Sequence, residues 1–138
     1  MQDNELRQSM ALLEAYNSQL EALAKQSQLL QMSLSEIVRA REALRALQET
    51  EEGEEVLVPV GASIFVSAKA SAKRSAIVSI GSRVSMEMNL DAALDYIKRN
   101  SDEISEALGK ISETVKSLEA TAQNLAVTVQ EEMTRRGQ

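Results

Sequence analysis

Residues 56–68 read "VLVPVGASIFVSA", a run of apolar and β-branched residues that contains the only proline of the chain. Such a run is typical of β-strands, and the "GA" in its middle predicts a turn between two short strands. Pro59 confines its strand to a sheet edge or a strand end, because proline has no backbone N–H. Residues 76–89 repeat the pattern around "GS", so two β-hairpins are predicted in the middle of the chain.

On both sides of the hairpins, apolar residues step by three and four, which is the spacing of a coiled-coil seam. The first seam contains Leu13, Tyr16, Leu20, Leu23, Ser27, Leu30, Leu34, Ile37, Arg41 and Leu44. The second contains Leu94, Ile97, Ser101, Ile104, Leu108, Ile111, Val115, Leu118, Ala122, Leu125 and Val129. Two arms of equal length predict one antiparallel coiled-coil hairpin with both chain ends at its tip. The alternative is two helices that each pair with another molecule.

The ends of the helices are also marked. In "ETEEGEE", residues 49–55, glutamates oppose the dipole at a helix C-terminus and Gly53 offers a left-handed position, so the first helix should stop there. Asn89 or Asp91 is expected to cap the second helix. The predicted fold class is α+β, a single unit of residues 1–138 with helices at 1–50 and 90–136 and two β-hairpins at 55–88.

An isolated two-stranded hairpin is marginal in water, because it leaves apolar surface and strand edges uncovered. We therefore expect hairpins from several chains to close a shared β-barrel between subunits. The residues expected at this interface are Val58, Ile64, Phe65, Val66, Val78, Ile80 and Val84.

Composition argues against most other functions. The net charge of −6 does not favour nucleic acid or an anionic membrane as a partner. With no Cys and no His, structural zinc, thiol chemistry and a histidine-activated serine are excluded, so Ser79 and Ser82 are interpreted as strand and turn residues. Glutamates at helical spacing, such as Glu51 and Glu54, are interpreted as solvated rather than metal-binding. We expect no cofactor, no metal and no enzymatic activity, and a cytoplasmic location because no signal peptide or long apolar run is present.

The stretches "LVPVGASIFVSAK" and "AIVSIGSRVSMEMNLDAALDYI", set between two coiled-coil arms, resemble the α-class subunit of prefoldin in its archaeal form. The resemblance covers essentially the whole chain, and "VPVGA" and "VSIG" are its most specific marks. It implies a hexamer of two α-class and four β-class subunits, which holds unfolded polypeptide without ATP at its coiled-coil tips and passes it to a group II chaperonin. The chain departs from the family at Ser63 and near Arg83, where the family often has glycine, and this affects turn geometry.

A protein that holds unfolded chains needs accessible apolar surface. Near the tip, the apolar residues outside the seam are Met10, Leu12, Val127 and Met133, and methionine suits the binding of variable sequences. Ordinary scattered apolar residues on a frayed helix end are the alternative. Leu29, Met32 and Val38 also lie outside the seam, where they would extend the binding surface or pack against a neighbouring arm. A structural, filament-forming relative or a coiled-coil scaffold remains the second hypothesis for the whole chain.

Overall fold

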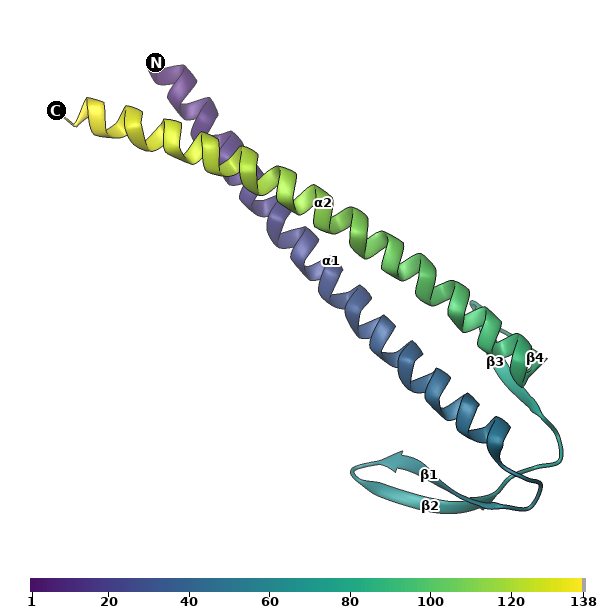
Figure 1. The fold of residues 1–138 in the computed structure, drawn as a ribbon. Helices are drawn as coiled ribbons and strands as arrows, with labels where there is room; N and C mark the ends of the chain where they lie inside the picture. Colours follow the sequence, from purple (N-terminus) through teal and green to yellow (C-terminus); the bar gives the residue numbers. More distant parts are fainter. Residues whose placement is uncertain (138) are drawn as a thin grey trace. The chain divides into compact units, whose positions relative to one another are not determined.

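The computed structural model describes residues 1–137, and its elements run in the order helix, two hairpins, helix (Figure 1). Their bounds are α1 Asp3–Glu49, β1 Glu55–Gly61, β2 Ile64–Lys69, β3 Ser75–Gly81, β4 Val84–Asn89 and α2 Leu90–Arg136. The chain divides into two compact units, the terminal unit (Met1–Ser33 with Glu103–Gln138) and the hairpin unit (Leu34–Asp102). The expected α+β class, a pair of long antiparallel helices joined by two β-hairpins, is confirmed.

The predicted seams are the least exposed stripes of both helices. Each seam residue is buried or half-buried. No residue of α1 is buried, whereas Ile111, Ala122 and Val129 of the α2 seam are. Partial burial is expected of a two-helix coiled coil, because each seam is covered by one partner helix only.

The terminal unit contains the beginning of α1 and the end of α2, which lie side by side and antiparallel. Leu13 lines one groove with Ala122, and Leu23 lines the next groove along the helices with Ile111. Both chain ends lie at the same end of this unit, where Arg136 forms an ion pair with Asp3 (Figure 1). The predicted antiparallel pairing of the two arms, with both ends at the tip, is therefore confirmed.

The hairpin unit contains the end of α1, both hairpins and the beginning of α2. Asn89, rather than Asp91, caps α2, because its Oδ1 accepts the Ala92 N–H at 2.7 Å. α1 ends at Glu49, earlier than Gly53, which does adopt the left-handed conformation (φ 81°) but lies in the loop to β1. There the Gly53 N–H donates to the Ala70 carbonyl at 2.8 Å, so this glycine closes the base of the first hairpin.

Strands β1 and β2 form hairpin 1, and β3 and β4 form hairpin 2. They are separate two-stranded antiparallel sheets within residues 1–137. In both, the register shifts one residue before the turn, which leaves Val60 and Ile80 without a cross-strand partner. Such a bulge strengthens the local twist and interrupts the alternation of side chains.

The turns hold strained residues. Ala62 and Ser63 connect β1 to β2 with φ values of 52° and 60°, the combination that a type I′ turn requires. Strand β2 therefore begins at Ile64, one residue later than predicted from the "GA" turn. In hairpin 2 the strained residue is Arg83, with a φ of 61°. A non-glycine residue in this left-handed conformation, such as Ser63 or Arg83, costs about 1–2 kcal/mol.

Candidate functional site

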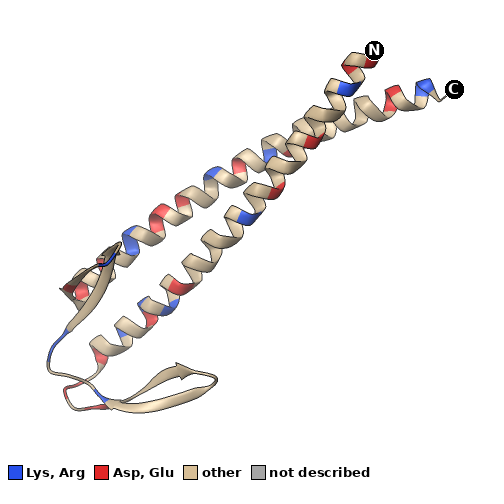
Figure 2. Ribbon diagram, turned by 180° about the vertical axis from the view of Figure 1, so that it is seen from behind, with Lys and Arg blue, Asp and Glu red and all other residues tan. Residues whose placement is uncertain are grey.

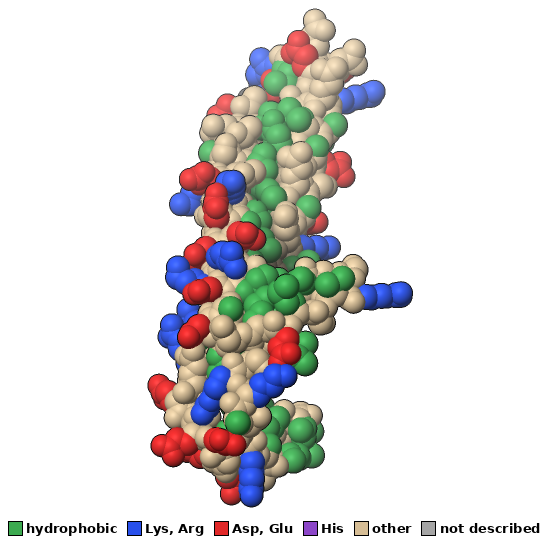
Figure 3. All heavy atoms as spheres, turned by 90° about the vertical axis from the view of Figure 1, so that its right-hand side faces the viewer, with side chains coloured by type: hydrophobic (Ala, Val, Ile, Leu, Met, Phe, Trp, Pro, Cys, Tyr) green, Lys and Arg blue, Asp and Glu red, His purple; other side chains and the backbone are tan. Residues whose placement is uncertain are grey.

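The hairpins expose most of their apolar residues. Of the predicted interface residues, Val78 is half-buried and the others are exposed, from 41 % at Ile80 to 59 % at Phe65. Figure 3 shows apolar side chains gathered on the hairpin surface. Leu57 (66 %), Ile77 (79 %) and Met86 (51 %) are exposed as well and were not among the predicted residues.

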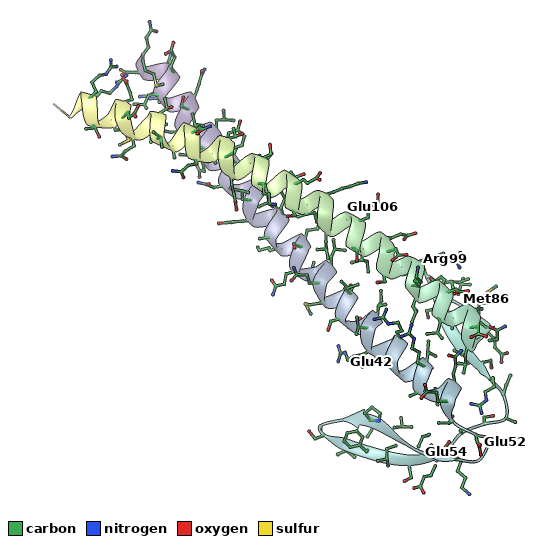
Figure 4. The ribbon with its side chains drawn as sticks, viewed as in Figure 1. Glu42, Glu52, Glu54, Met86, Arg99 and Glu106 are labelled. Carbon is green, nitrogen blue, oxygen red and sulfur yellow. The ribbon has the colours of Figure 1, made fainter. Side chains whose placement is uncertain are left out.

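Each hairpin has one face made of aliphatic residues alone. Cross-strand partners share a face. The aliphatic face of hairpin 1 contains Val56, Val58, Ile64, Val66 and Ala68, and that of hairpin 2 contains Ala76, Val78, Val84, Met86 and Met88. Met86 is marked on β4 in Figure 4. Two faces without any polar group are suited to the interior of a barrel or sandwich.

The faces opposite to these differ between the hairpins. In hairpin 2, Glu87 accepts a hydrogen bond from Ser75 (2.8 Å) and pairs with Lys73 (Nζ to Oε1 2.5 Å). Ser79 lies opposite Ser85 on the same face, and Ile77, opposite Glu87, is its apolar residue. The hydrogen bond and charge of Lys73, with the Ser75 hydroxyl, hold the pKa of Glu87 below its usual value. The equivalent face of hairpin 1 has Glu55 and Lys69 at its base but Leu57, Pro59 and Phe65 toward its turn.

An apolar groove of about 290 Å³ lies between the end of α1 and β1, inside the hairpin unit. Ala43, Ala46 and Leu47 line it from the helix, and Val56, Leu57, Val58 and Pro59 line it from the strand, with Thr50 between them. Hairpin 1 therefore presents apolar surface to the helix end as well as outward.

Charges of both signs occur along both helices, except in residues 26–35 and 120–130, and hairpin 1 has no charged residue between Glu55 and Lys69 (Figure 2). All five glutamates of residues 49–55 are exposed, and Glu52 and Glu54 are marked in the loop after α1 in Figure 4. Among residues 1–137, no three acidic side chains lie close enough to hold a metal ion. Within the same range, neither helix has an apolar stretch long enough to cross a membrane.

The four predicted tip residues, Met10, Leu12, Val127 and Met133, all lie in the terminal unit and are 46–48 % exposed. They are not gathered in one groove: a groove of about 640 Å³ includes Val127 but is lined by α2 alone, without Met133. Leu29 and Met32 are more exposed still, at 64 % and 59 %, and their i, i+3 spacing makes them neighbours on the back of α1. Val38, predicted to belong with them, is half-buried.

The tip also holds a charged cluster that the sequence analysis missed. Glu132 is buried, with 9 % of its surface exposed, and it accepts hydrogen bonds from Arg135 (2.6 Å) and from Arg136 (3.0 Å). These two guanidinium groups lower the pKa of Glu132 to about 2, Arg135 having the larger effect. Arg136 also pairs with Asp3, so the cluster joins α2 to α1. Glu132 continues the heptad spacing of Leu125 and Val129, so this spacing could have predicted that Glu132 lies in the seam.

Known proteins are similar to this chain in both sequence and fold. The family model "Prefoldin subunit" matches residues 16–135. The prefoldin subunit alpha of Methanothrix thermoacetophila is 32 % identical over 80 % of this chain and 72 % of its own length. That of Pyrococcus horikoshii is 33 % identical over 83 % of this chain and 78 % of its own length.

Among solved structures, a chain of the filamentous prefoldin from Methanocaldococcus jannaschii aligns with a TM-score of 0.69 and 26 % identity, covering 83 % of this chain and 95 % of its own. The family model alone spans most of the chain, and the paired helices with two central hairpins recur in the solved relative. The chain therefore belongs to the prefoldin subunit family.

Proposed function

We propose that the chain acts, as one undivided subunit, in a cytoplasmic chaperone that holds unfolded polypeptide without ATP and without catalysis. Membership of the prefoldin family supports this proposal. The observation that carries it is the pair of hairpins whose aliphatic faces are largely exposed in hairpin 1 and partly exposed in hairpin 2 in the single chain. Such faces need partners from other chains, because a two-stranded ribbon buries too little surface to be stable alone.

In the assembly that we propose, the hairpins close a β-barrel shared between subunits, and closure removes the free strand edges. The partners are β-class prefoldin subunits, in a hexamer with two α-class and four β-class chains. The relatives named prefoldin subunit alpha support the α-class assignment.

Client binding is assigned to the tip residues Met10, Leu12, Val127 and Met133. An unfolded chain offers no fixed epitope, so several weak contacts of about 1–3 kcal/mol must act together. Linking several arms in one assembly raises avidity by about 10²–10⁴. The held polypeptide is then delivered to a group II chaperonin.

Truncation tests this function. Removing the residues through Leu12 and those after Leu125 should leave the assembly intact, because the hairpins are untouched. The truncated assembly should fail to suppress aggregation of a diluted, denatured client in the absence of ATP. Serine at the four tip residues should give a milder loss.

The matched control replaces Leu29 and Met32 by serine, since these residues are as apolar and more exposed but lie farther along α1. Full protection by the truncated assembly, together with a loss in the control, would move the client site to the back of α1. Full protection by both would assign it to the partner subunit.

Filament formation is the second candidate, favoured by the likeness to a filamentous prefoldin at 26 % identity. A filament former grows when it is alone, whereas a hexamer subunit reaches a defined mass only with its β-class partner. Light scattering of the purified chain, with and without that partner, separates the two.

A further inference from the structure

One side chain from the loop between the hairpins reaches the end of α1. The Arg74 guanidinium donates Nη1 to the Leu47 carbonyl at 2.6 Å and to Thr50 Oγ1 at 3.3 Å. Its Nη2 donates to the Thr50 carbonyl. The last carbonyls of a helix carry partial negative charge, so a forked cation is a fitting cap for them. The Leu47 carbonyl also accepts the N–H (3.2 Å) and the hydroxyl (2.7 Å) of Thr50, so Arg74 adds to a local turn at the helix end.

The backbone of the same residue reaches α2. The Arg74 carbonyl accepts the N–H of Leu90, the first residue of α2, at 3.2 Å. Next to this contact, Gln48 Nε2 donates to Asp91 Oδ1 at 2.6 Å. Arg74 thus bonds to the end of one helix with its side chain and to the start of the other with its backbone.

Three apolar residues form a small core in the same unit, namely Ala70 at 9 %, Leu90 at 6 % and Ala93 at 0 % exposure. Ala70 and Leu90 immediately follow β2 and β4, so the ends of these strands are buried while the strands themselves are largely exposed. Within residues 1–137, no strand of hairpin 2 pairs with a strand of hairpin 1. Its direction therefore depends on what holds its base.

We propose that Arg74 is the positioning residue that fixes the base of hairpin 2 against the end of α1, and so presents that hairpin to the neighbouring subunit. β3 begins at the next residue, Ser75, and β4 continues directly into α2. Fixing the helix ends therefore fixes both strands of the hairpin. The part that concerns neighbouring subunits rests on the proposed assembly through the hairpins.

The neighbouring residue provides a contrast. Lys73 pairs with Glu87 of β4, so its contact stays within the base of hairpin 2. Arg74 reaches across to another element. A lysine in place of Arg74 would keep the charge but lose the fork that contacts two carbonyls at once. Lys73→Gln is therefore the matched control, and Arg74→Lys separates charge from geometry.

The first measurement is the distribution of distances between two spin labels on the full chain alone. The chain has no native cysteine, so labels attached at Arg45→Cys and Ser82→Cys are the only ones present. Both positions are exposed, one on α1 and one at the turn of hairpin 2, and both belong to the hairpin unit. Arg74→Gln should broaden the distance distribution by about twofold, Arg74→Lys should broaden it less, and Lys73→Gln should leave it unchanged. An unchanged distribution in Arg74→Gln overturns the proposal.

The second measurement is assembly with a β-class prefoldin subunit, followed by light scattering. Arg74→Gln should weaken assembly by about tenfold, because a hairpin that is no longer pre-oriented must be ordered on binding. A broadened distribution with normal assembly refutes the functional part. Weakened assembly with a normal distribution makes Arg74 a direct contact with the neighbour instead.

A rescue experiment tests whether weakened assembly of Arg74→Gln comes from a misplaced hairpin rather than from a folding defect. Cysteines at Gln48 and Asp91, joined by a short thiol crosslinker, tie the helix ends without Arg74. If Arg74 acts by position, the crosslink restores assembly in Arg74→Gln chains that carry no spin-label cysteines, and failure to restore assembly contradicts the proposal. If the wild-type chain does not assemble with its partner, the proposed function fails, whereas the distance measurement still decides the role of Arg74.

Discussion

The two hairpins share a construction and differ on one face. Both have an aliphatic face, and both shift register one residue before the turn. On the opposite face, the last cross-strand pair before that shift is Pro59–Phe65 in hairpin 1 and Ser79–Ser85 in hairpin 2. Near its turn, hairpin 1 is thus apolar on both faces, whereas hairpin 2 is polar on this face; Ile77, opposite Glu87 and farther from the turn, is the apolar residue of that face.

This difference indicates unequal places in an assembly. A sheet with one polar face can lie at the surface with the other face packed, whereas a sheet that is apolar on both faces is covered on both. Hairpin 1 is expected to be the more deeply buried of the two. The hairpins would then be unequal contributors to the subunit contacts, and substitutions can measure the inequality.

The largest effect is expected on the aliphatic faces. Val66→Glu in hairpin 1 or Val78→Glu in hairpin 2 would bury an unpaired charge in the barrel, at about 3–5 kcal/mol. Either variant should release smaller species, seen as a lower mass by light scattering. Ser79→Glu, on the polar face of hairpin 2, is the control. An unchanged mass in both valine variants would refute the shared barrel.

The second test addresses the opposite faces directly. Phe65→Ser should weaken assembly by about 1.5–3 kcal/mol, the value of a buried large apolar side chain. At the equivalent position of hairpin 2, Ser85→Ala should alter the free energy of assembly by less than about 0.5 kcal/mol. Titration calorimetry with the β-class partner measures both. Equal effects would mean that the two hairpins are equally covered.

The turns allow a smaller test. Ser63→Gly and Arg83→Gly each remove a side chain from a left-handed residue and should stabilise their hairpin by about 0.5–1 kcal/mol. Hairpin 1 should gain further from Ala62→Gly, because both residues of its turn have positive φ. Amide hydrogen exchange of the strands reports the change, and faster exchange in the glycine variants would contradict it.

The smallest effect concerns pH and belongs to hairpin 2. Because the folded pKa of Glu87 lies below its ordinary value of 4.5, its ion pair with Lys73 contributes stability that is complete above that value. The contribution is lost as pH falls through the lowered folded pKa. The protection factors of β3 and β4 amides, which correct for the intrinsic pH dependence of exchange, should fall on acidification, and Glu87→Gln should remove this fall. An equal fall in the variant would assign the effect to another group.

The sequence predicted the helices and their seams well, because heptad spacing is a local and repeated signal. It also predicted two hairpins and the Asn89 cap, since turn and cap residues act on their immediate neighbours. The contacts of Arg74 could not be predicted, because they join a loop to a helix end 24 to 27 residues away. Glu132 was missed because it occupies a seam position by spacing, but its carboxylate is not one of the apolar residues by which a seam is recognised. The binding roles of the tip and hairpin residues stay predictions.

Glu132 has a consequence for how the two helices align. Apolar coiled-coil seams that contain small residues tolerate sliding by a whole heptad, because one apolar contact replaces another. Sliding of α1 in the terminal unit would separate Asp3 from Arg136 and the N-terminal amine from the buried Glu132 carboxylate, which now lie 3.7 Å apart. The cluster therefore specifies the axial register of the coiled coil, and with it which apolar residues of α1 stand beside those of α2 at the tip.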